Sequence, residues 1–167
     1  MSTWYPIEIY SLFLRVCGDI EVIRPLRLSD TLNRISSHLE LRNATVDPLS
    51  SNFPVLAHPQ QESMLAKNGI TIVCPTKEPS PASNPALWRE KIPQTYLFTT
   101  QTFSLMAEAH LDLHESLTDH LERYPSDFLP LTNISALWIA GAAAMSHAVQ
   151  RPFGLLNPAT IVSFTAQ

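Results

Sequence analysis

The stretch Leu28-Ser29-Asp30-Thr31-Leu32-Asn33-Arg34 occurs twice in this chain of 167 residues. It returns 89 positions later, in diverged form, as Leu117-Thr118-Asp119-His120-Leu121-Glu122-Arg123. Internal repetition at a fixed offset indicates duplicated structural units, and two units are too few for a solenoid. The sequence therefore predicts two tandem copies of one small domain. Two further pairs of blocks repeat in the same order, Leu39–Thr45 with Leu129–Ser135 and Thr71–Val73 with Thr160–Val162.

The repeat divides the chain into two predicted domains and a linker. Residues 1–76 form the first domain and residues 92–167 form the second, while residues 77–91 have the Pro- and Ser-rich composition of a linker. A domain of this size has only a marginal hydrophobic core, so we expect the two copies to share an interface. We predict an intramolecular pseudo-dimer in which corresponding strands meet about an approximate two-fold axis.

The repeated stretch has the pattern of a helix N-terminus. Ser29 and Thr118 are predicted N-caps, because a hydroxyl can accept a hydrogen bond from a free N–H of the first turn. Asp30 and Asp119 would follow in that turn, where the helix dipole favours a carboxylate. Pro125 limits the second helix to about two turns. We interpret both aspartates as capping residues rather than catalytic ones.

Most of the remaining sequence alternates between apolar and polar residues, as strands do. Each copy then has the element order β-β-α-β-β-β, which predicts an α+β, mainly β fold built as a small barrel or a curved sheet. Cys17-Gly18-Asp19 is predicted to be a turn or a bulge. Asn68-Gly69 is the strongest hairpin signal in the chain.

The first copy resembles an uncharacterised bacterial small-domain family, a domain of unknown function with an Arg-Leu-Ser-Asp-x-Leu-Asn motif. The motif stands here at Arg27–Asn33, and a Leu-x-Leu-x-Asn-Ala-x-Val strand follows at Leu39–Val46. In the second copy Ser116 replaces Arg27 and Glu122 replaces Asn33. The resemblance implies a fold and no assigned activity. In strand count the domains are also similar in shape to Sm-like and SH3-like small barrels.

Composition and charge disfavour several classes of function. The net charge is −4, and residues 92–167 carry only two basic groups against six acidic ones. An acidic surface is a poor match for phosphate backbones, so we expect no DNA partner. The N-terminus lacks a basic signal-peptide region, and two cysteines, Cys17 and Cys74, are too few for a disulfide framework. We therefore predict a cytoplasmic protein with reduced thiols.

The apolar segment Trp138–Met145 lies in the longest uncharged run of the chain, residues 129–150. A membrane helix needs about 20 predominantly apolar residues, and this run is interrupted by polar ones. The equivalent run of the first copy holds Arg42 and Asp47, so we expect no membrane partner. We predict instead that Trp138, Ile139 and Met145 are buried between the copies or against a partner.

One cluster of titratable residues suggests chemistry. His110, Asp112 and His114 would share a face of a strand and, with His120 nearby, could hold a metal ion. The same spacing is typical of a solvated strand face, which we favour. No phosphate-binding loop, zinc-protease motif or nucleophile elbow occurs in the sequence. We predict no catalytic residue, no cofactor and no metal site.

Together these features favour a non-catalytic protein-interaction or assembly module that binds a protein partner or self-associates. Its predicted interaction residues are Arg27, Trp138, Ile139 and Met145. Arg27, beside the predicted helix cap, would bind an acidic group of a partner or pair with Asp30. The alternative is a regulatory module that binds a small ligand or RNA in the groove between the copies or along an Sm-like strand edge. A third option is an enzyme that uses His110, Asp112 and His114 with zinc.

Overall fold

The computed structural model describes residues 2–23, 25–49, 60–77, 91–139 and 148–167. We call the described residues up to 77 the N-terminal half and those from 91 onward the C-terminal half. The N-terminal half contains β1 (Ser2–Ser11), β2 (Leu14–Ile23), α1 (Leu28–Arg34), β3 (His38–Pro48), β4 (Gln60–Ala66), η1 (Lys67–Gly69) and β5 (Ile70–Pro75). The C-terminal half contains β6 (Ile92–Thr100), β7 (Phe103–Leu111), α2 (Leu117–Arg123), β8 (Leu129–Trp138), β9 (Ala148–Leu156), η3 (Pro158–Thr160) and β10 (Ile161–Ala166).

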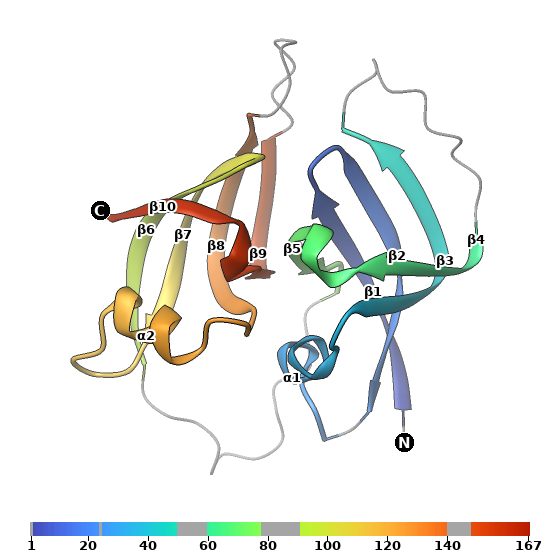
Figure 1. Ribbon diagram of the computed structural model, residues 1–167, viewed down its shortest axis with the longest axis horizontal. Coiled ribbons are helices and arrows are strands. Elements are labelled where there is room, and N and C mark those ends of the chain that lie inside the picture. Colours follow the sequence, from blue (N-terminus) through green and yellow to red (C-terminus); the bar gives the residue numbers. More distant parts are fainter. Residues whose placement is uncertain (1, 24, 50–59, 78–90, 140–147) are drawn as a thin grey trace.

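The ten strands form one antiparallel sheet in the order β10-β6-β7-β8-β9-β5-β1-β2-β3-β4. Figure 1 shows the five strands of each half as a separate group, with β5 and β9 between them. The mainly β fold class is thus confirmed. The sheet is open among the described strands. Neither half is a closed barrel, because the two edge strands of each group, β5 and β4 in the N-terminal half and β10 and β9 in the C-terminal half, do not pair with each other.

The predicted two-fold axis is wrong. A two-fold pair would bring the same strand of each half to the contact, whereas here β5 of one half pairs with β9 of the other. By element order, the counterpart of β9 is β4, and the counterpart of β5 is β10. The halves are therefore joined head to tail, and β4 and β10 lie at the two ends of the sheet.

The predicted Asn68-Gly69 hairpin is also wrong. These residues lie in the 3-10 turn η1, and the strands before and after it pair with β3 and with β1 and β9 respectively, not with each other. The turn carries the chain from one edge of the five-stranded group to the other. In the C-terminal half, η3 does the same directly before Ile161. When the last strands of the two halves are aligned from these turns, Ile70 corresponds to Ile161. This alignment differs by two positions from the one that the sequence suggested, which paired Thr71 with Thr160.

A bulge with an asparagine in the left-handed conformation recurs in both halves. Asn43 and Asn133 each have a φ of 51°, which asparagine tolerates better than most residues. The side-chain amide of Asn43 donates to Asp19 at 2.9 Å, and that of Asn133 donates to Glu108 at 2.8 Å. The pairing register shifts at Cys17–Asp19, so this segment is a bulge and not a hairpin turn.

The helix caps lie two residues before the predicted ones. Arg27 and Ser116 are the N-cap residues, so Ser29 and Thr118 lie inside the first turn. The Asp119 carboxylate accepts from the backbone N–H of Ser116 at 3.1 Å, and the Ser116 hydroxyl accepts from the N–H of Asp119 at the same distance. Hydrogen bonds from Ser116 lower the pKa of Asp119 below its ordinary value. The aspartates cap, as predicted.

We predict that Ser116→Ala lowers the free energy of unfolding by about 0.5–2 kcal/mol, because one N–H of the first turn loses its acceptor. Thr118→Ala is the matched control, since it removes a hydroxyl two residues after the cap, inside the first turn. It should change stability by less than about 0.5 kcal/mol. Urea unfolding of the purified variants measures both. Equal losses in the two variants would contradict the assignment of the cap.

Two hydrophobic clusters fill the structure, and each draws residues from both halves. The first contains the buried side chains of β6–β9 together with Tyr10, Ile72 and Cys74 of the N-terminal half. The second contains the buried side chains of β1–β3 together with Phe128 and Leu155 of the C-terminal half. Neither half therefore has a core made only from its own residues.

Candidate functional site at the junction of the halves

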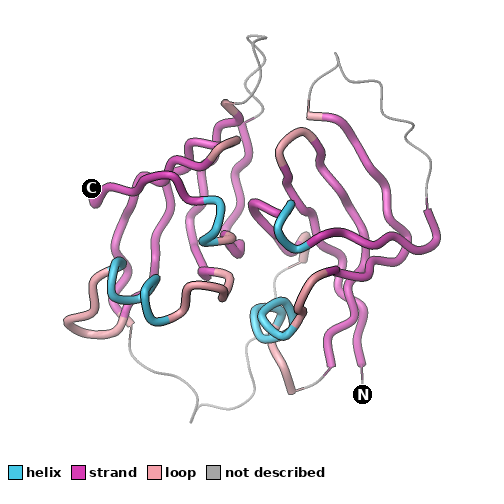
Figure 2. Tube along the Cα trace, in the orientation of Figure 1, coloured by secondary structure: helices cyan, strands magenta, loops and turns pink. Residues whose placement is uncertain are grey.

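The junction is built on a short backbone ladder. Ile72 pairs with Leu156 and Val73 pairs with Leu155, and the N–H of Asn157 donates to the carbonyl of Thr71 at 2.9 Å. Figure 2 shows these two strands adjacent at the centre of the molecule. The sequence favours this arrangement because β5 is mostly apolar on both faces, as suits a strand that is covered on both faces by packed side chains.

Asn157 fixes the end of β9 against the N-terminal half. Its side chain is 6% exposed, and its amide donates to the carbonyls of Ile70 at 2.8 Å and Lys67 at 3.3 Å. Its side-chain oxygen accepts from the N–H of Ala159 at 3.1 Å. The nitrogen and the oxygen of the buried Asn157 side chain are thus both hydrogen-bonded to backbone groups. These hydrogen bonds fix the register of the junction.

A polar cluster of Glu8, Tyr10 and Arg151 lies beside this ladder. The Arg151 guanidinium forms an ion pair with the Glu8 carboxylate, and Nε lies 3.2 Å from the same oxygen. The Tyr10 hydroxyl donates to Glu8 at 2.9 Å. The Arg151 side chain is 31% exposed and that of Glu8 is 13% exposed. The cluster therefore joins β1 of one half to β9 of the other through a partly desolvated ion pair.

The electrostatics of the cluster follow from burial and pairing. Burial alone would raise the pKa of Glu8, but hydrogen bonds from Arg151 and Tyr10 and the charge of Arg151 bring it below its ordinary value. Burial and the Glu8 carboxylate raise the pKa of Tyr10. Burial raises the pKa of the neighbouring Cys74 thiol to about 12, so this cysteine stays protonated at neutral pH.

Further contacts between the halves surround the cluster. The Tyr10 ring packs edge-on against Phe103 with centroids 5.9 Å apart. The Asn33 side chain accepts from the N–H of Phe128 at 2.8 Å, and the Trp138 indole N–H donates to the carbonyl of Leu12 at 3.3 Å. Asn33, the sixth residue of the repeated stretch Leu28–Arg34, therefore acts at the junction.

A hollow of about 610 Å³ opens at the junction beside Arg151. Arg151 and Lys77 are the cations in its wall, and Glu8 is the anion. The Arg151 guanidinium donates to Glu8 and Tyr10, and also to the carbonyl of Gln150 at 2.7 Å. Most of its donor capacity is thus used to hold the two halves together. The complete lining is Glu8, Pro75, Thr76, Lys77, Gln150, Arg151, Pro152 and Phe153.

The predicted metal candidates do not come together. His110 Nε2 lies 2.8 Å from the Thr132 hydroxyl, and His114 has a φ of 68° in the loop after β7. The backbone N–H of Asp112 donates to Glu115 at 3.2 Å, and His120 lies 3.3 Å from the same carboxylate. No group of three or more metal-ligating side chains occurs in the part of the chain that the structure describes.

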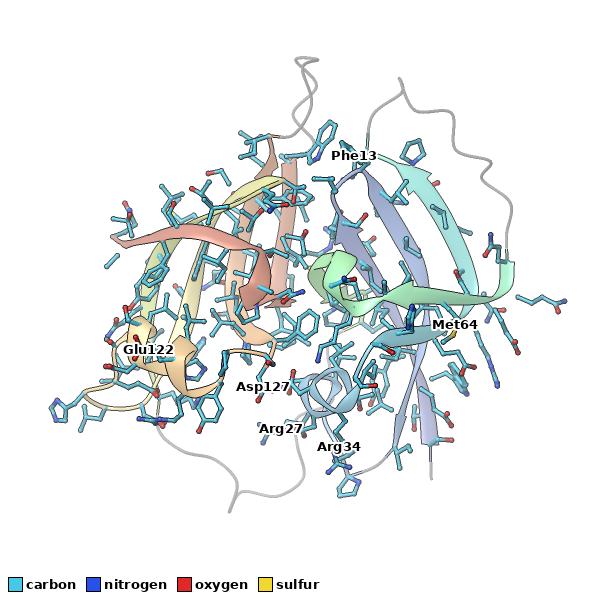
Figure 3. All side chains as sticks on the ribbon, in the orientation of Figure 1. Phe13, Arg27, Arg34, Met64, Glu122 and Asp127 are labelled. Atoms are coloured by element: carbon cyan, nitrogen blue, oxygen red, sulfur yellow. The ribbon has the colours of Figure 1, made fainter. Side chains whose placement is uncertain are left out.

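The four predicted interaction residues lie in different environments. Trp138 is 6% exposed and contacts Leu12 across the junction, which confirms its burial between the halves. Ile139 is 45% exposed, so it is not buried between the halves, and its burial against a partner stays a prediction. It follows the last residue of β8 and no longer alternates into the core. Arg27 is exposed beside α1, and Figure 3 labels it together with Arg34. Met145 lies outside the described residues.

Sequence reasoning missed Glu8, Arg151 and Asn157. One signal was available for Arg151, because residues 92–167 contain only two basic side chains, Arg123 and Arg151. An isolated cation in an apolar segment is unusual unless it has a partner. Nothing in the sequence pointed to Glu8 as that partner, since the two residues are far apart in the chain.

No family model, curated protein or solved structure matches this chain. The described residues also contain no helix long and apolar enough to cross a membrane. Among the described strands, the candidate site consists of the junction in the middle of the sheet and an open strand at each end of it.

Proposed function

We propose that this chain is a non-catalytic, cytoplasmic protein-interaction module. In this proposal, residues 1–76 and 92–167 are two diverged copies of one small β-rich domain that form a head-to-tail pseudo-dimer. The module binds an extended segment of a partner protein by adding it as a strand to an open edge of its sheet. The free thiols of Cys17 and Cys74 support the cytoplasmic location. The resemblance to the uncharacterised bacterial family is part of the same proposal.

The observation that carries the proposal is the pair of open edges. Among the described strands, β4 pairs only with β3, and β10 pairs only with β6. An unpaired edge presents a row of N–H and C=O groups that can pair with another chain. Each edge strand also has a strongly exposed apolar side chain, Met64 at 63% and Val162 at 66%. Extended segments commonly bind such edges, with backbone hydrogen bonds supplying affinity.

The molecule itself supplies a precedent for strand addition. The counterpart of β10 is β5, and β5 accepts β9 in antiparallel orientation. Strand β10 also has two exposed polar side chains, Ser163 and Thr165. Such short hydroxyl side chains leave room for an added strand beside β10, and they can remain in water on the exposed face of the sheet after that strand binds. We therefore favour β10 as the docking edge and an extended peptide segment as its occupant.

We predict that Val162→Lys weakens partner binding by about tenfold, or about 1.4 kcal/mol, because charged edge residues, lysine especially, block strand pairing. Ile23→Lys is the matched control, since Ile23 is 57% exposed on β2, which has a strand on each side. A photo-crosslinking residue at position 162 would identify the partner segment. Binding of that segment as a peptide would then be titrated against both variants.

Amide hydrogen exchange provides the structural readout. The bound peptide should slow exchange in residues 161–166 and leave β2 unchanged. If the peptide protects the walls of the junction hollow instead, or if Ile23→Lys weakens binding as much as Val162→Lys, the edge-binding proposal is wrong. Hollow protection would favour the alternative function, a small-ligand or RNA regulatory module, which the hollow beside Arg151 and Lys77 supports.

A further inference from the structure

Each open edge has a counterpart inside the junction, position by position. Strands β5 and β10 both begin directly after a 3-10 turn, so their residues can be matched by position. The third residue is Ile72 in β5 and Ser163 in β10, and the fifth is Cys74 in β5 and Thr165 in β10. Strand β4 ends at Ala66, directly before the turn η1. The residue directly before the turn η3 is Asn157, which follows the end of β9, so Ala66 matches Asn157. The pairing of Leu39 with Leu65 and of Leu129 with Leu156 confirms the match.

At the junction, the matched positions are apolar and cross into the opposite half. Ile72 is 1% exposed and Cys74 is 0% exposed, and both belong to the core of the C-terminal half. In the other direction, Phe128 and Leu155 are buried in the core of the N-terminal half, and Phe153 packs against it. The head-to-tail junction thus depends on apolar side chains entering from both sides.

At the open edges most of the counterparts are polar. Ser163 and Thr165 stand where the junction has Ile72 and Cys74, and both are exposed. On the opposite edge, His38 stands in the place of Phe128, Glu62 in that of Phe153 and Met64 in that of Leu155; all three are exposed.

The polar contacts of the junction are also missing from the open edges. Gln60 stands in the position of Arg151, and Ala66 stands in that of Asn157. Neither Gln60 nor Ala66 can reproduce the ion pair or the buried amide. Glu122 of α2 takes the place of Asn33. Figure 3 labels Glu122 and Met64, which lie on opposite sides of the view, at the two ends of the molecule.

We infer that the two ends of the sheet are built to refuse a further copy of this chain, so that the head-to-tail junction forms only once. A heterologous junction can repeat into a ring or an open filament unless the ends of the molecule differ from it. Docking a second copy on β10 in the same register would bury the Glu62 carboxylate and the His38 imidazole in an apolar core, which is strongly unfavourable. Polar terminal surfaces likewise end the arrays of repeat proteins.

This inference deepens the proposed interaction function by excluding one partner, a second copy joined as the halves are joined. The inference and the proposed function can be tested separately. Failure to find a peptide partner would contradict the proposed function and leave the inference intact. Self-assembly of the wild-type chain through its ends would contradict the inference and leave strand addition intact.

The test restores the junction residues at the ends of the full-length chain. Ser163→Ile with Thr165→Val changes one end, and His38→Phe with Glu62→Phe changes the other. Each double variant alone should sediment as a single chain, and an equimolar mixture should form complexes of two chains. The quadruple variant, with both ends changed, should form longer oligomers whose size grows with concentration. Circular dichroism and urea unfolding confirm that each variant is folded.

A cysteine pair tests the register. In the same register as the junction, residue 163 of one chain would lie opposite residue 65 of the next. Leu65→Cys with Ser163→Cys, combined with Thr165→Val, His38→Phe and Glu62→Phe, would therefore give a ladder of disulfide-linked chains, while the cysteine pair in the wild-type background gives single chains. Three outcomes would overturn the inference: a ladder in the wild-type background, folded end variants that never associate, or association of one double variant alone.

Discussion

Gly154→Ala should lower the free energy of unfolding by about 1–3 kcal/mol, which is the usual cost of overpacking a filled core. A Cβ atom at this position would lie 2.7 Å from Ile134 Cδ1, 3.0 Å from Cys74 Sγ and 3.3 Å from the carbonyl oxygen of Val73. Two of these neighbours belong to β5, on the other side of the junction. The extra methyl group would therefore push the two halves apart at the ladder that joins them.

Gly69→Ala is the matched control for this prediction. A Cβ atom there would meet nothing within 4 Å, and neither glycine has a positive φ. The control should be neutral or slightly stabilising, because alanine has less freedom than glycine in the unfolded chain. Chemical denaturation of both variants gives the comparison. A Gly154→Ala protein as stable as Gly69→Ala would mean that the junction is more loosely packed than the structure shows.

Much of the fold could be predicted from the repeat alone. The matched Leu28–Arg34 and Leu117–Arg123 segments are the two helices, and the β-β-α-β-β-β order around each holds. These features depend on local signals, since alternation, capping carboxylates and asparagines act over a few residues. The same local signals identified Asp30 and Asp119, whose carboxylates do cap the helices.

The relation between the halves could not be predicted in the same way. A repeated sequence is equally compatible with a two-fold contact and with a head-to-tail one, and only the side chains at the edges decide between them. The deciding difference lies in the last strands, where the apolar Ile72 and Cys74 of one half match the polar Ser163 and Thr165 of the other. A two-residue shift in the alignment before these strands concealed that difference. The sequence match paired Thr71–Val73 with Thr160–Val162, which aligned the wrong residues.

Arg151→Met should lower the free energy of unfolding by about 2–3 kcal/mol at pH 7. Removing one partner of a buried ion pair costs about 3–5 kcal/mol, since the other charge is left unpaired. The Arg151 side chain is 31% exposed, so we expect less than the full cost. Arg15→Met is the control, because Arg15 and its partner Asp47 are 42% and 45% exposed and lie 3.3 Å apart. The control should cost less than about 1 kcal/mol.

The cost of Arg151→Met should also shrink as the pH falls from 7 towards 3. In the wild-type protein the pKa of Glu8 is lowered, so its contribution to stability is present above the ordinary carboxyl pKa and is lost as the pH falls through the folded-state value. Without Arg151, the pKa of Glu8 lies closer to or above its ordinary value, because the hydrogen bond and the charge that oppose burial most strongly are gone, so the folded variant loses less stability in acid than the wild-type protein does. The two stability curves should therefore converge in acid. Urea unfolding of both proteins at several pH values measures this, and a gap that widens towards pH 3 would show that Arg151 does not hold the junction through Glu8.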